Sequence, residues 1–383
     1  MHINIFCQVV DNLGDIGVCW RLARQLDRDY DCTVDLWVDD LSSFARIEPL
    51  AVDNEAEQTI GNVVIRHWSE PFEGEIAIGE VVIEAFACGL PEEVIAAMAE
   101  MNTPPVWFNL EYLSAEKWVE ECHDKPSQHP RYPLTTHFFF PGFTDKTGGL
   151  IREHNLAETR DFFQADPIEF SEWAEGVGLP SVKDVDEQWV SLFCYPSAPV
   201  TLMLEEMAKG EGRTRVLVPE GVAKAQIDAF VGHPFTKGME FTKGNLTMHS
   251  LPYTDQAGYD RLLWACDFNF VRGEDSFVRA QWAARPFIWQ IYPQDENIHF
   301  EKLQAFLSVY GVNLGQAARE ALDFGHLMWN QSAALWPEAA SRLRAHQAEL
   351  EAHARVWAAS KTQETDLAHR LLARVAAETA KDD

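Results

Sequence analysis

The 383-residue chain lacks the features that would place it in a membrane or in a disulfide framework. No apolar run approaches the roughly 18 residues that a transmembrane helix needs, and no cationic leader precedes an apolar segment. The seven cysteines are odd in number and show no C-x-x-C spacing, which argues against a disulfide framework and against a zinc site. We therefore expect a cytoplasmic protein with reduced thiols and no membrane partner.

Positive charge is also scarce. The chain has 31 Lys and Arg residues against 60 Asp and Glu residues, so its formal net charge is -29. Nucleic acids and anionic membranes are bound by clustered cations, and this composition argues against both as partners. A basic protein surface remains an allowed partner.

Common cofactor and catalytic motifs are missing as well. There is no P-loop and no G-x-S-x-G elbow, and the loop after the first expected strand lacks G-x-G-x-x-G. The 13 histidines form no H-E-x-x-H or H-x-x-x-H pair. We therefore expect neither a metal nor a resident cofactor.

The sequence does contain a repeated alternation of short apolar strands and amphipathic helices. An apolar run at 3–10 is typical of a strand buried on both faces, and the helix after it places Val18, Cys19, Leu22 and Leu26 on one side. Further strands are expected at 34–38, 63–66, 81–85, 106–110, 190–195, 215–219, 246–251, 268–271 and 286–291, and a helix at 91–101. The alternation predicts doubly wound α/β domains.

The length of the chain and a proline-rich, irregular stretch between about 114 and 165 predict two domains. We assign an N-terminal Rossmann-like domain to 1–170 and a C-terminal one to 185–355. Residues 336–380 are rich in Ala, Leu, Glu and Arg and are expected to be long helix. Its last part, 356–383, is a C-terminal helix able to return to the first domain.

The loop after the first strand carries two carboxylates, Asp11 and Asp15, around Asn12, Leu13 and Gly14. Glycine allows the chain to turn tightly after a strand, and two carboxylates in one loop suit general-base chemistry. We expect these residues to line a ligand site. The same residue types also favour turns and helix caps, so a structural role explains the loop equally well on local sequence.

A second strand–loop–helix unit lies at 268–282, with the turn Arg272-Gly273-Glu274-Asp275-Ser276. A cation and a hydroxyl at the positive end of a helix suit an anion, and a phosphate better than a metal. In the structural alternative, Asp275 or Ser276 caps the helix and Arg272 pairs with Glu274 on the surface.

Other strand ends in the second half supply aromatic and amide groups. Ligands in open parallel sheets lie beyond the carboxyl ends of the strands. We therefore expect Tyr195, Tyr253 and Gln256, which follow strands, to line the same site as the turn at 272–276. An aromatic ring to stack on a base, an amide for its edge, and an arginine with a helix N-terminus for a diphosphate would form a nucleotide site. Each residue alone is also typical of core or surface.

Four long segments resemble one family. They are INIFCQVVDNLGDIGVCWRLARQL at 3–26, NLEYLSAEKW at 109–118, TTHFFFPGF at 135–143 and DFNFVRGEDSFVRAQWAARPFIWQIYPQ at 267–294. They resemble the EarP family, the bacterial protein-arginine rhamnosyltransferases that modify elongation factor P. The resemblance spans nearly the whole chain. It implies a GT-B glycosyltransferase in which two Rossmann-like domains face a central cleft.

The resemblance further implies dTDP-β-L-rhamnose as the donor and an arginine of elongation factor P as the acceptor, with inversion at the sugar. The modified factor would be active in translation of polyproline stretches. From the residues alone, two other classes stay open: a nucleotide-sugar-processing enzyme of GT-B shape acting on a small molecule, and a non-catalytic acidic docking protein.

Site roles follow from the resemblance motif by motif. It implies that Asp15 is the general base with support from Asp11, and that Glu274 is a further catalytic residue. The turn at 272–276 would hold the diphosphate and the sugar. Tyr195 and Gln256 lie where the family binds the thymidine.

Overall fold

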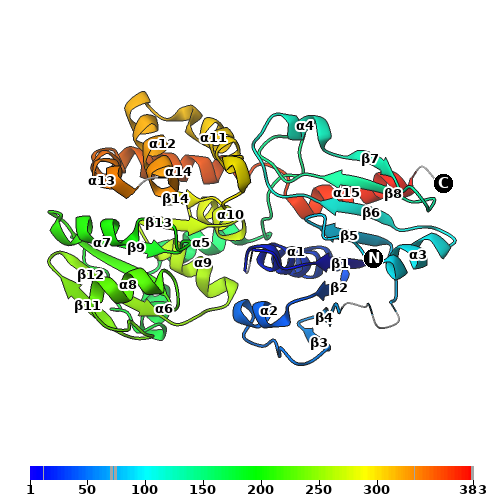
Figure 1. Ribbon diagram of the computed structural model, residues 1–383, viewed down its shortest axis with the longest axis horizontal. Coiled ribbons are helices and arrows are strands. Elements are labelled where there is room, and N and C mark those ends of the chain that lie inside the picture. Colours follow the sequence, from blue (N-terminus) through cyan, green and yellow to red (C-terminus); the bar gives the residue numbers. More distant parts are fainter. Residues whose placement is uncertain (12, 70–71, 73–75, 332, 381–383) are drawn as a thin grey trace. The chain divides into compact units, whose positions relative to one another are not determined.

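The computed structural model describes residues 1–11, 13–69, 72, 76–331 and 333–380. It divides into two compact units (Figure 1). Unit 1 comprises Met1–His154, Phe300–Val309 and Glu364–Asp383, and unit 2 comprises Asn155–His299 and Tyr310–Gln363. Each unit contains one largely parallel sheet with helices packed on it, so the predicted α/β class is confirmed.

Unit 1 is built on an eight-stranded sheet of order β3-β4-β2-β1-β5-β6-β8-β7. The strands pair in parallel except at the two edges, where β3 and β7 are antiparallel to their neighbours. Its elements are β1 (His2–Cys7), α1 (Gly14–Tyr30), β2 (Thr33–Val38), α2 (Leu41–Ile47), β3 (Glu57–Ile60), β4 (Val63–His67), β5 (Val81–Ala85), α3 (Glu92–Glu100), β6 (Val106–Leu110), α4 (Trp118–Cys122), β7 (Lys125–Gln128), β8 (Thr135–Phe139), α15 (Leu367–Thr379) and most of α11 (His299–Tyr310).

Strand β1 lies at the centre of this sheet because its side chains are apolar on both faces. Ile3 and Ile5 point to the core shared with α1, α2 and α15, and Phe6 points to a second core with Trp37 and α3. Burial of one such side chain contributes roughly 1.5 to 3 kcal/mol. Strand β1 pairs with β2 on one side and β5 on the other, so the direction of winding reverses beside it.

Unit 2 is built on a six-stranded sheet of order β11-β12-β10-β9-β13-β14, in which β11 alone among the described strands is antiparallel. Winding reverses between β9 and β13. The elements are α5 (Leu156–Ala165), α6 (Pro167–Gly176), β9 (Glu187–Leu192), α7 (Val200–Lys209), β10 (Arg213–Pro219), α8 (Lys224–Val231), β11 (Glu240–Lys243), β12 (Leu246–Leu251), α9 (Gln256–Ala265), β13 (Phe268–Arg272), α10 (Asp275–Trp282), β14 (Phe287–Gln290), α12 (Gln316–Gln331), α13 (Trp336–Ala345) and α14 (Gln347–Lys361).

The predicted boundary at 170 differs from the structure. Helix α5, at 156–165, belongs to unit 2 because two of its side chains bond to carbonyl groups there. Arg160 donates to the Trp282 carbonyl at 2.8 Å, and Gln164 donates to the Ala283 carbonyl at 3.0 Å. Unit 2 therefore begins near 155, and the 170 boundary falls inside α6.

The segment expected to be long helix, 336–380, is helical through most of its length but forms three helices, α13, α14 and α15. Asp366 begins α15 by accepting the His369 N–H at 3.1 Å, and it also accepts the Tyr30 hydroxyl of α1 at 3.0 Å. The tail thus divides: residues up to Gln363 lie in unit 2 and α15 lies in unit 1. Among the described residues, no helix is long and apolar enough to cross a membrane.

Candidate functional site

The loop between β1 and α1 holds Asp15 as a buried carboxylate. Asp15 is the second residue of α1 and is 2% exposed. Its Oδ2 accepts the backbone N–H groups of Val10 and Asp11, each at 2.8 Å. These bonds fold the loop over the start of the helix, where the positive end of the helix dipole favours a carboxylate.

Asp11 and Gly14 close this loop. The Gly14 N–H donates to the Asp11 carbonyl at 2.6 Å, and a Cβ at Gly14 would lie 2.7 Å from Asp11 Oδ2. A side chain at position 14 would therefore displace the Asp11 carboxylate, which packs against Gly14. Leu13 lies at the N-cap of α1, and Asn12 lies outside the described residues. The predicted acidic pair is thus brought together in unit 1.

Residues from the neighbouring strands complete this half-site, and the sequence analysis did not identify them. The Tyr112 hydroxyl donates to Asp15 Oδ1 at 3.0 Å. The Tyr112 ring stacks on Phe86 with centroids 4.3 Å apart, and the Lys302 ammonium lies 5.5 Å from its centroid. Phe86 follows β5 and Tyr112 follows β6, so they lie beyond the same strand ends as the loop after β1.

Glu111 adds a further acidic group next to Tyr112. Burial raises the pKa of Glu111, and so does the nearby Glu84 carboxylate, while the Lys302 ammonium and the Asn109 amide oppose the rise. Asn109 Nδ2 donates to Glu111 Oε1 at 3.0 Å. The unit 1 half-site therefore concentrates carboxylates, as a site for a cationic ligand would.

In unit 2, the turn after β13 is anchored by Ser276. The Arg272 N–H donates to Ser276 Oγ at 3.1 Å, and the Ser276 hydroxyl donates back to the Arg272 carbonyl. Gly273 has a φ of +63°, which glycine adopts without strain. Helix α10 then begins at Asp275, and the Glu274 side chain does not cap it. The first turn of α10 accordingly lies directly beyond Arg272.

The Arg272 side chain is held between two aromatic rings. Its guanidinium carbon lies 4.6 Å from the Phe193 centroid and 4.5 Å from the Tyr195 centroid. The Tyr195 N–H donates to Gln290 Oε1 at 2.7 Å, and Gln290 Nε2 donates to Ser197 Oγ at 3.0 Å. These contacts fix the cation at the carboxyl ends of β9 and β13. They agree with the predicted grouping of Tyr195 and Arg272.

Tyr253 precedes α9, and Gln256 is the first residue of this helix. Gln256 is 4% exposed, and its Nε2 lies 3.5 Å from Asp275 Oδ2, so the structure brings it to the turn. Tyr253 is 41% exposed after β12. A buried ion pair fixes α9 to α10: Arg279 donates to Asp260 at 2.9 and 2.6 Å. Because a bidentate pair is directional, it holds the last turn of α10 against α9.

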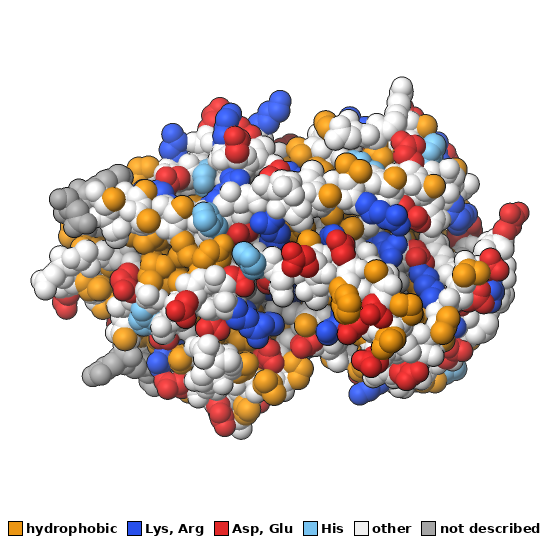
Figure 2. Space-filling model, turned by 180° about the vertical axis from the view of Figure 1, so that it is seen from behind, with side chains coloured by type: hydrophobic (Ala, Val, Ile, Leu, Met, Phe, Trp, Pro, Cys, Tyr) orange, Lys and Arg blue, Asp and Glu red, His pale blue; other side chains and the backbone are white. Residues whose placement is uncertain are grey.

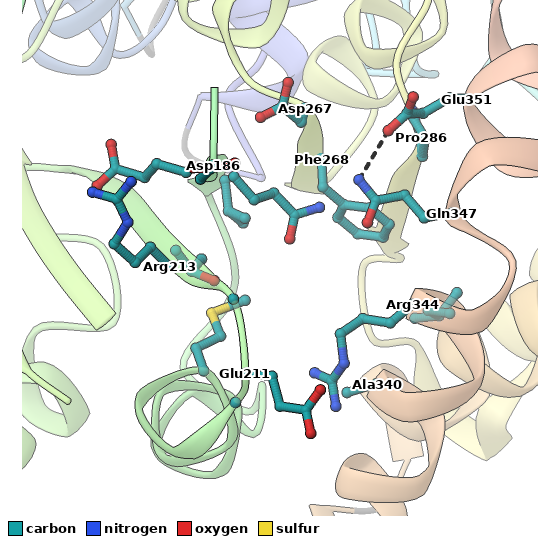
Figure 3. A pocket seen from close by; sticks show the side chains of 18 of the residues that line it. Asp186, Glu211, Arg213, Asp267, Phe268, Pro286, Ala340, Arg344, Gln347 and Glu351 are labelled. Atoms are coloured by element: carbon teal, nitrogen blue, oxygen red, sulfur yellow. Dashed lines mark hydrogen bonds between the residues drawn. The ribbon is translucent and has the colours of Figure 1, made fainter. Parts of the chain in front are cut away.

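A cavity of about 640 Å³ lies at the amino ends of the unit 2 strands, opposite the end that carries Arg272 (Figure 3). It is lined by residues at the amino ends of strands, including Arg213 and Phe268, and Glu211 and Arg344 point toward one another across it. Among its described lining residues there is none of the predicted site residues. Ligands of open parallel sheets bind beyond the carboxyl ends of the strands, which is the end that carries Arg272.

Charge is not segregated on the visible surface. Figure 2 shows Asp and Glu side chains spread over that face with Lys and Arg side chains among them. The net charge of -29 is thus a property of the whole chain. The local arrangement of charges, rather than the total, has to explain binding.

Comparisons with known proteins agree on one family. A family model described as elongation factor P (EF-P) rhamnosyltransferase EarP matches residues 3–376. The protein-arginine rhamnosyltransferase of Pseudomonas putida is 46% identical over 370 residues, covering 96% of this chain and 97% of that protein. The corresponding protein of Shewanella oneidensis is 42% identical over 387 residues, covering 97% and 96%.

Solved structures agree as well. A structure described as the basis for EarP-mediated arginine glycosylation of translation elongation factor EF-P matches with a TM-score of 0.69 and 34% identity, covering 97% of both chains. Phytolacca americana UGT2, complexed with UDP-2-fluoro-glucose and pterostilbene, matches with a TM-score of 0.50 and 10% identity, covering 98% of this chain and 99% of that one. The second match shows the fold alone, and with the first it confirms the predicted GT-B class.

Proposed function

The chain belongs to the EarP family of EF-P rhamnosyltransferases, which makes it a glycosyltransferase, and from that premise we propose that it transfers rhamnose from dTDP-β-L-rhamnose to an arginine side chain of elongation factor P. The single observation that carries the proposal is the opposite chemistry of two similar loops. One presents a buried carboxylate and the other presents an arginine held between aromatic rings.

The acceptor chemistry is assigned to unit 1. A guanidinium has a pKa above about 12 and delocalised lone pairs, so it must lose a proton to become a useful nucleophile. Asp15, supported by Asp11, binds the cation and removes that proton as attack proceeds. The carboxylate is already ordered by two backbone donors, so little reorganisation is needed during the reaction.

The donor chemistry is assigned to unit 2. Negative charge builds on the β-phosphate as the bond to the sugar breaks, and Arg272 with the start of α10 neutralises it. Tyr195 and Gln256 bind the thymidine, with Tyr253 beside them, and Glu274 binds the sugar. In this scheme the protein's own cation supports the leaving group, and we propose no divalent metal and no cofactor beyond the donor.

The proposed reaction is a single displacement. An arginine nitrogen forms a bond to the anomeric carbon while the bond from that carbon to the β-phosphate oxygen breaks, and dTDP leaves with the electron pair. The proton of the attacking nitrogen passes to Asp15. Attack opposite the leaving group inverts the β-linked donor to an α-rhamnosyl arginine. This reaction requires both half-sites to act on one sugar in a shared cleft. The central cleft expected from the sequence stays a prediction.

The test is to incubate the protein with dTDP-β-L-rhamnose and elongation factor P and to measure the mass of the acceptor by mass spectrometry. The expected result is a gain of one deoxyhexose on one arginine, with α configuration by nuclear magnetic resonance. Release of a modified free sugar without a change in acceptor mass would indicate a small-molecule enzyme, and complex formation alone would indicate a docking protein. Because the proposed acceptor is a translation factor, we propose that the protein acts in the cytoplasm and that the modified factor is active in translation of polyproline stretches.

A further inference from the structure

Tyr112 contacts the proposed general base directly. Its hydroxyl donates to Asp15 Oδ1 at 3.0 Å, whereas Asp15 Oδ2 accepts two backbone N–H groups. A carboxylate offers about four lone-pair sites, so the three donors among the described residues leave about one, and it lies on Oδ1. The three donors also hold the carboxylate plane in one orientation, because they approach both oxygens.

The Tyr112 ring is itself held in place from two neighbouring parts of unit 1. Phe86 stacks on it with centroids 4.3 Å apart and planes 15° apart, and the Lys302 ammonium lies 5.5 Å from its centroid. Tyr112 is 37% exposed, so burial alone would not immobilise it. The two contacts restrict the ring and thereby the direction of its hydroxyl.

The turn that carries Phe86 is strained, and the strain is offset locally. Phe86 and Ala87 have φ values of 58° and 52°, in the region that non-glycine residues rarely adopt. Such a conformation is unfavourable and persists only where the surroundings enforce it. Here the Phe86 N–H donates to the Leu110 carbonyl at 2.7 Å, and the Ala87 N–H donates to Asn109 Oδ1 at 3.1 Å. The turn is thus fastened to β6, the strand that leads to Tyr112.

We propose that Tyr112 is a positioning residue of the transfer reaction, whose hydroxyl orients the Asp15 carboxylate so that the remaining Oδ1 lone pair takes the proton of the acceptor arginine. This inference rests on the proposed function. Phe86 and Lys302 hold the Tyr112 ring, so they act through it.

The test is Tyr112→Phe, which removes the hydroxyl and keeps the ring. The expected loss in kcat is about 10-fold or more, since Asp15 loses one of the three hydrogen bonds that orient its carboxylate. KM for the acceptor should stay within about twofold of the parent value, since the charge of Asp15 remains. The acid limb of the kcat/KM profile should move to higher pH, because a carboxylate that loses a donor holds its proton more tightly.

Tyr30→Phe is the matched control. The Tyr30 hydroxyl donates to Asp366 Oδ2 at 3.0 Å, also within unit 1, where it fastens α1 to the start of α15. Its loss should lower the melting temperature while leaving kcat and the acid limb unchanged. A tyrosine that only stabilises the fold would behave like Tyr30, so parental kcat and an unmoved acid limb in Tyr112→Phe would overturn the proposal.

Phe86→Leu provides a second test that keeps the Tyr112 hydroxyl and loosens its ring. It should lower kcat by a few-fold and move the acid limb in the same direction, and parental values for both would also overturn the proposal. Asp15→Asn separates this inference from the proposed function. If Asp15→Asn is active, the base itself is misassigned; if Asp15→Asn is inactive while Tyr112→Phe and Phe86→Leu match the parent, the positioning role alone fails.

Discussion

The β1–α1 and β13–α10 loops are built alike and differ in the charge that they present. Each follows a parallel strand beside the reversal of winding in its own sheet and leads into the first turn of a helix. In both, the second helical residue bonds back to the loop. In α1 that residue is Asp15, which takes two loop N–H groups, and in α10 it is Ser276, which bonds to the N–H and carbonyl of Arg272.

The difference in side chains fits the opposite ligands proposed for the two loops. The acidic side chain at position two of α1 accepts two loop N–H groups and suits a cation. A serine there is neutral, so the helix end and Arg272 remain positive toward an anion. Asp275 adds negative charge to the second loop, and its Oδ2 lies 3.5 Å from Gln256 Nε2. In the proposed scheme, Asp15 in one loop and Arg272 with Ser276 in the other decide which substrate each half-site suits.

The proposed difference between the two loops is tested most directly at Asp15. Asp15→Asn keeps the side-chain volume, and its amide oxygen can still accept the loop N–H groups, but it no longer takes a proton. We expect kcat to fall by about 10²- to 10⁴-fold, the usual range for a general base. Affinity for dTDP should remain parental by calorimetry, because that ligand is assigned to unit 2. Activity within a few-fold of the parent would remove Asp15 from the role of base.

The second prediction concerns the size of the acceptor. In the proposed scheme the unit 1 loop binds one guanidinium, so we expect a protein acceptor to be held also by docking contacts beyond the arginine. A ten-residue peptide around the target arginine should have a kcat/KM about 100-fold or more below that of the folded acceptor domain, because binding remote from the chemistry positions the reacting group. Equal values for peptide and domain would show that recognition is by local sequence instead.

The third prediction removes the cation of the second loop. Arg272→Ala should weaken dTDP binding about 10- to 100-fold, which corresponds to roughly 1.5 to 3 kcal/mol for a charge-assisted contact. Arg272→Lys should lie between the parent and Arg272→Ala, because lysine keeps the charge and loses the planar stacking between Phe193 and Tyr195. Unchanged dTDP affinity in Arg272→Ala would place the nucleotide elsewhere.

The central strands were predictable because they are buried on both faces. Strand β1, at 2–7, and strand β5, at 81–85, are apolar runs whose composition alone favours a parallel sheet. The edge strands β3, β7 and β11 were missed, because an antiparallel edge strand is short and polar, as in the sequence KPSQ of β7. The inner strand β8, at 135–139, was missed too, because it lies in the proline-rich stretch that was expected to be irregular. Each is defined by its pairing with one neighbour, which no local pattern reveals.

The candidate site, like the sheets, was predictable only in part. The residues inside the two loops were identified because their types suit a cation or an anion by themselves. Tyr112 and Phe193 were not identified, since their roles depend on which strands lie beside β1 and β13. Strand order is set by tertiary packing and by the reversal of winding. A rule on strand ends found Tyr195, but it could not say that Arg272 lies between two rings.

The smallest predicted effect concerns Phe193, one of those two rings. Phe193→Leu removes one aromatic face from Arg272 and keeps an apolar side chain, so the guanidinium loses one cation–π contact, worth about 0.5 to 1 kcal/mol. Affinity for dTDP should therefore fall by about two- to fivefold, with kcat unchanged once the donor is saturating. Phe230→Leu is the matched control, since the Lys243 ammonium lies 4.5 Å from the Phe230 centroid in the same unit but away from the loop. If both variants weaken dTDP equally, the effect comes from general loosening of unit 2; if neither does, Tyr195 and the turn are sufficient to hold Arg272 in place.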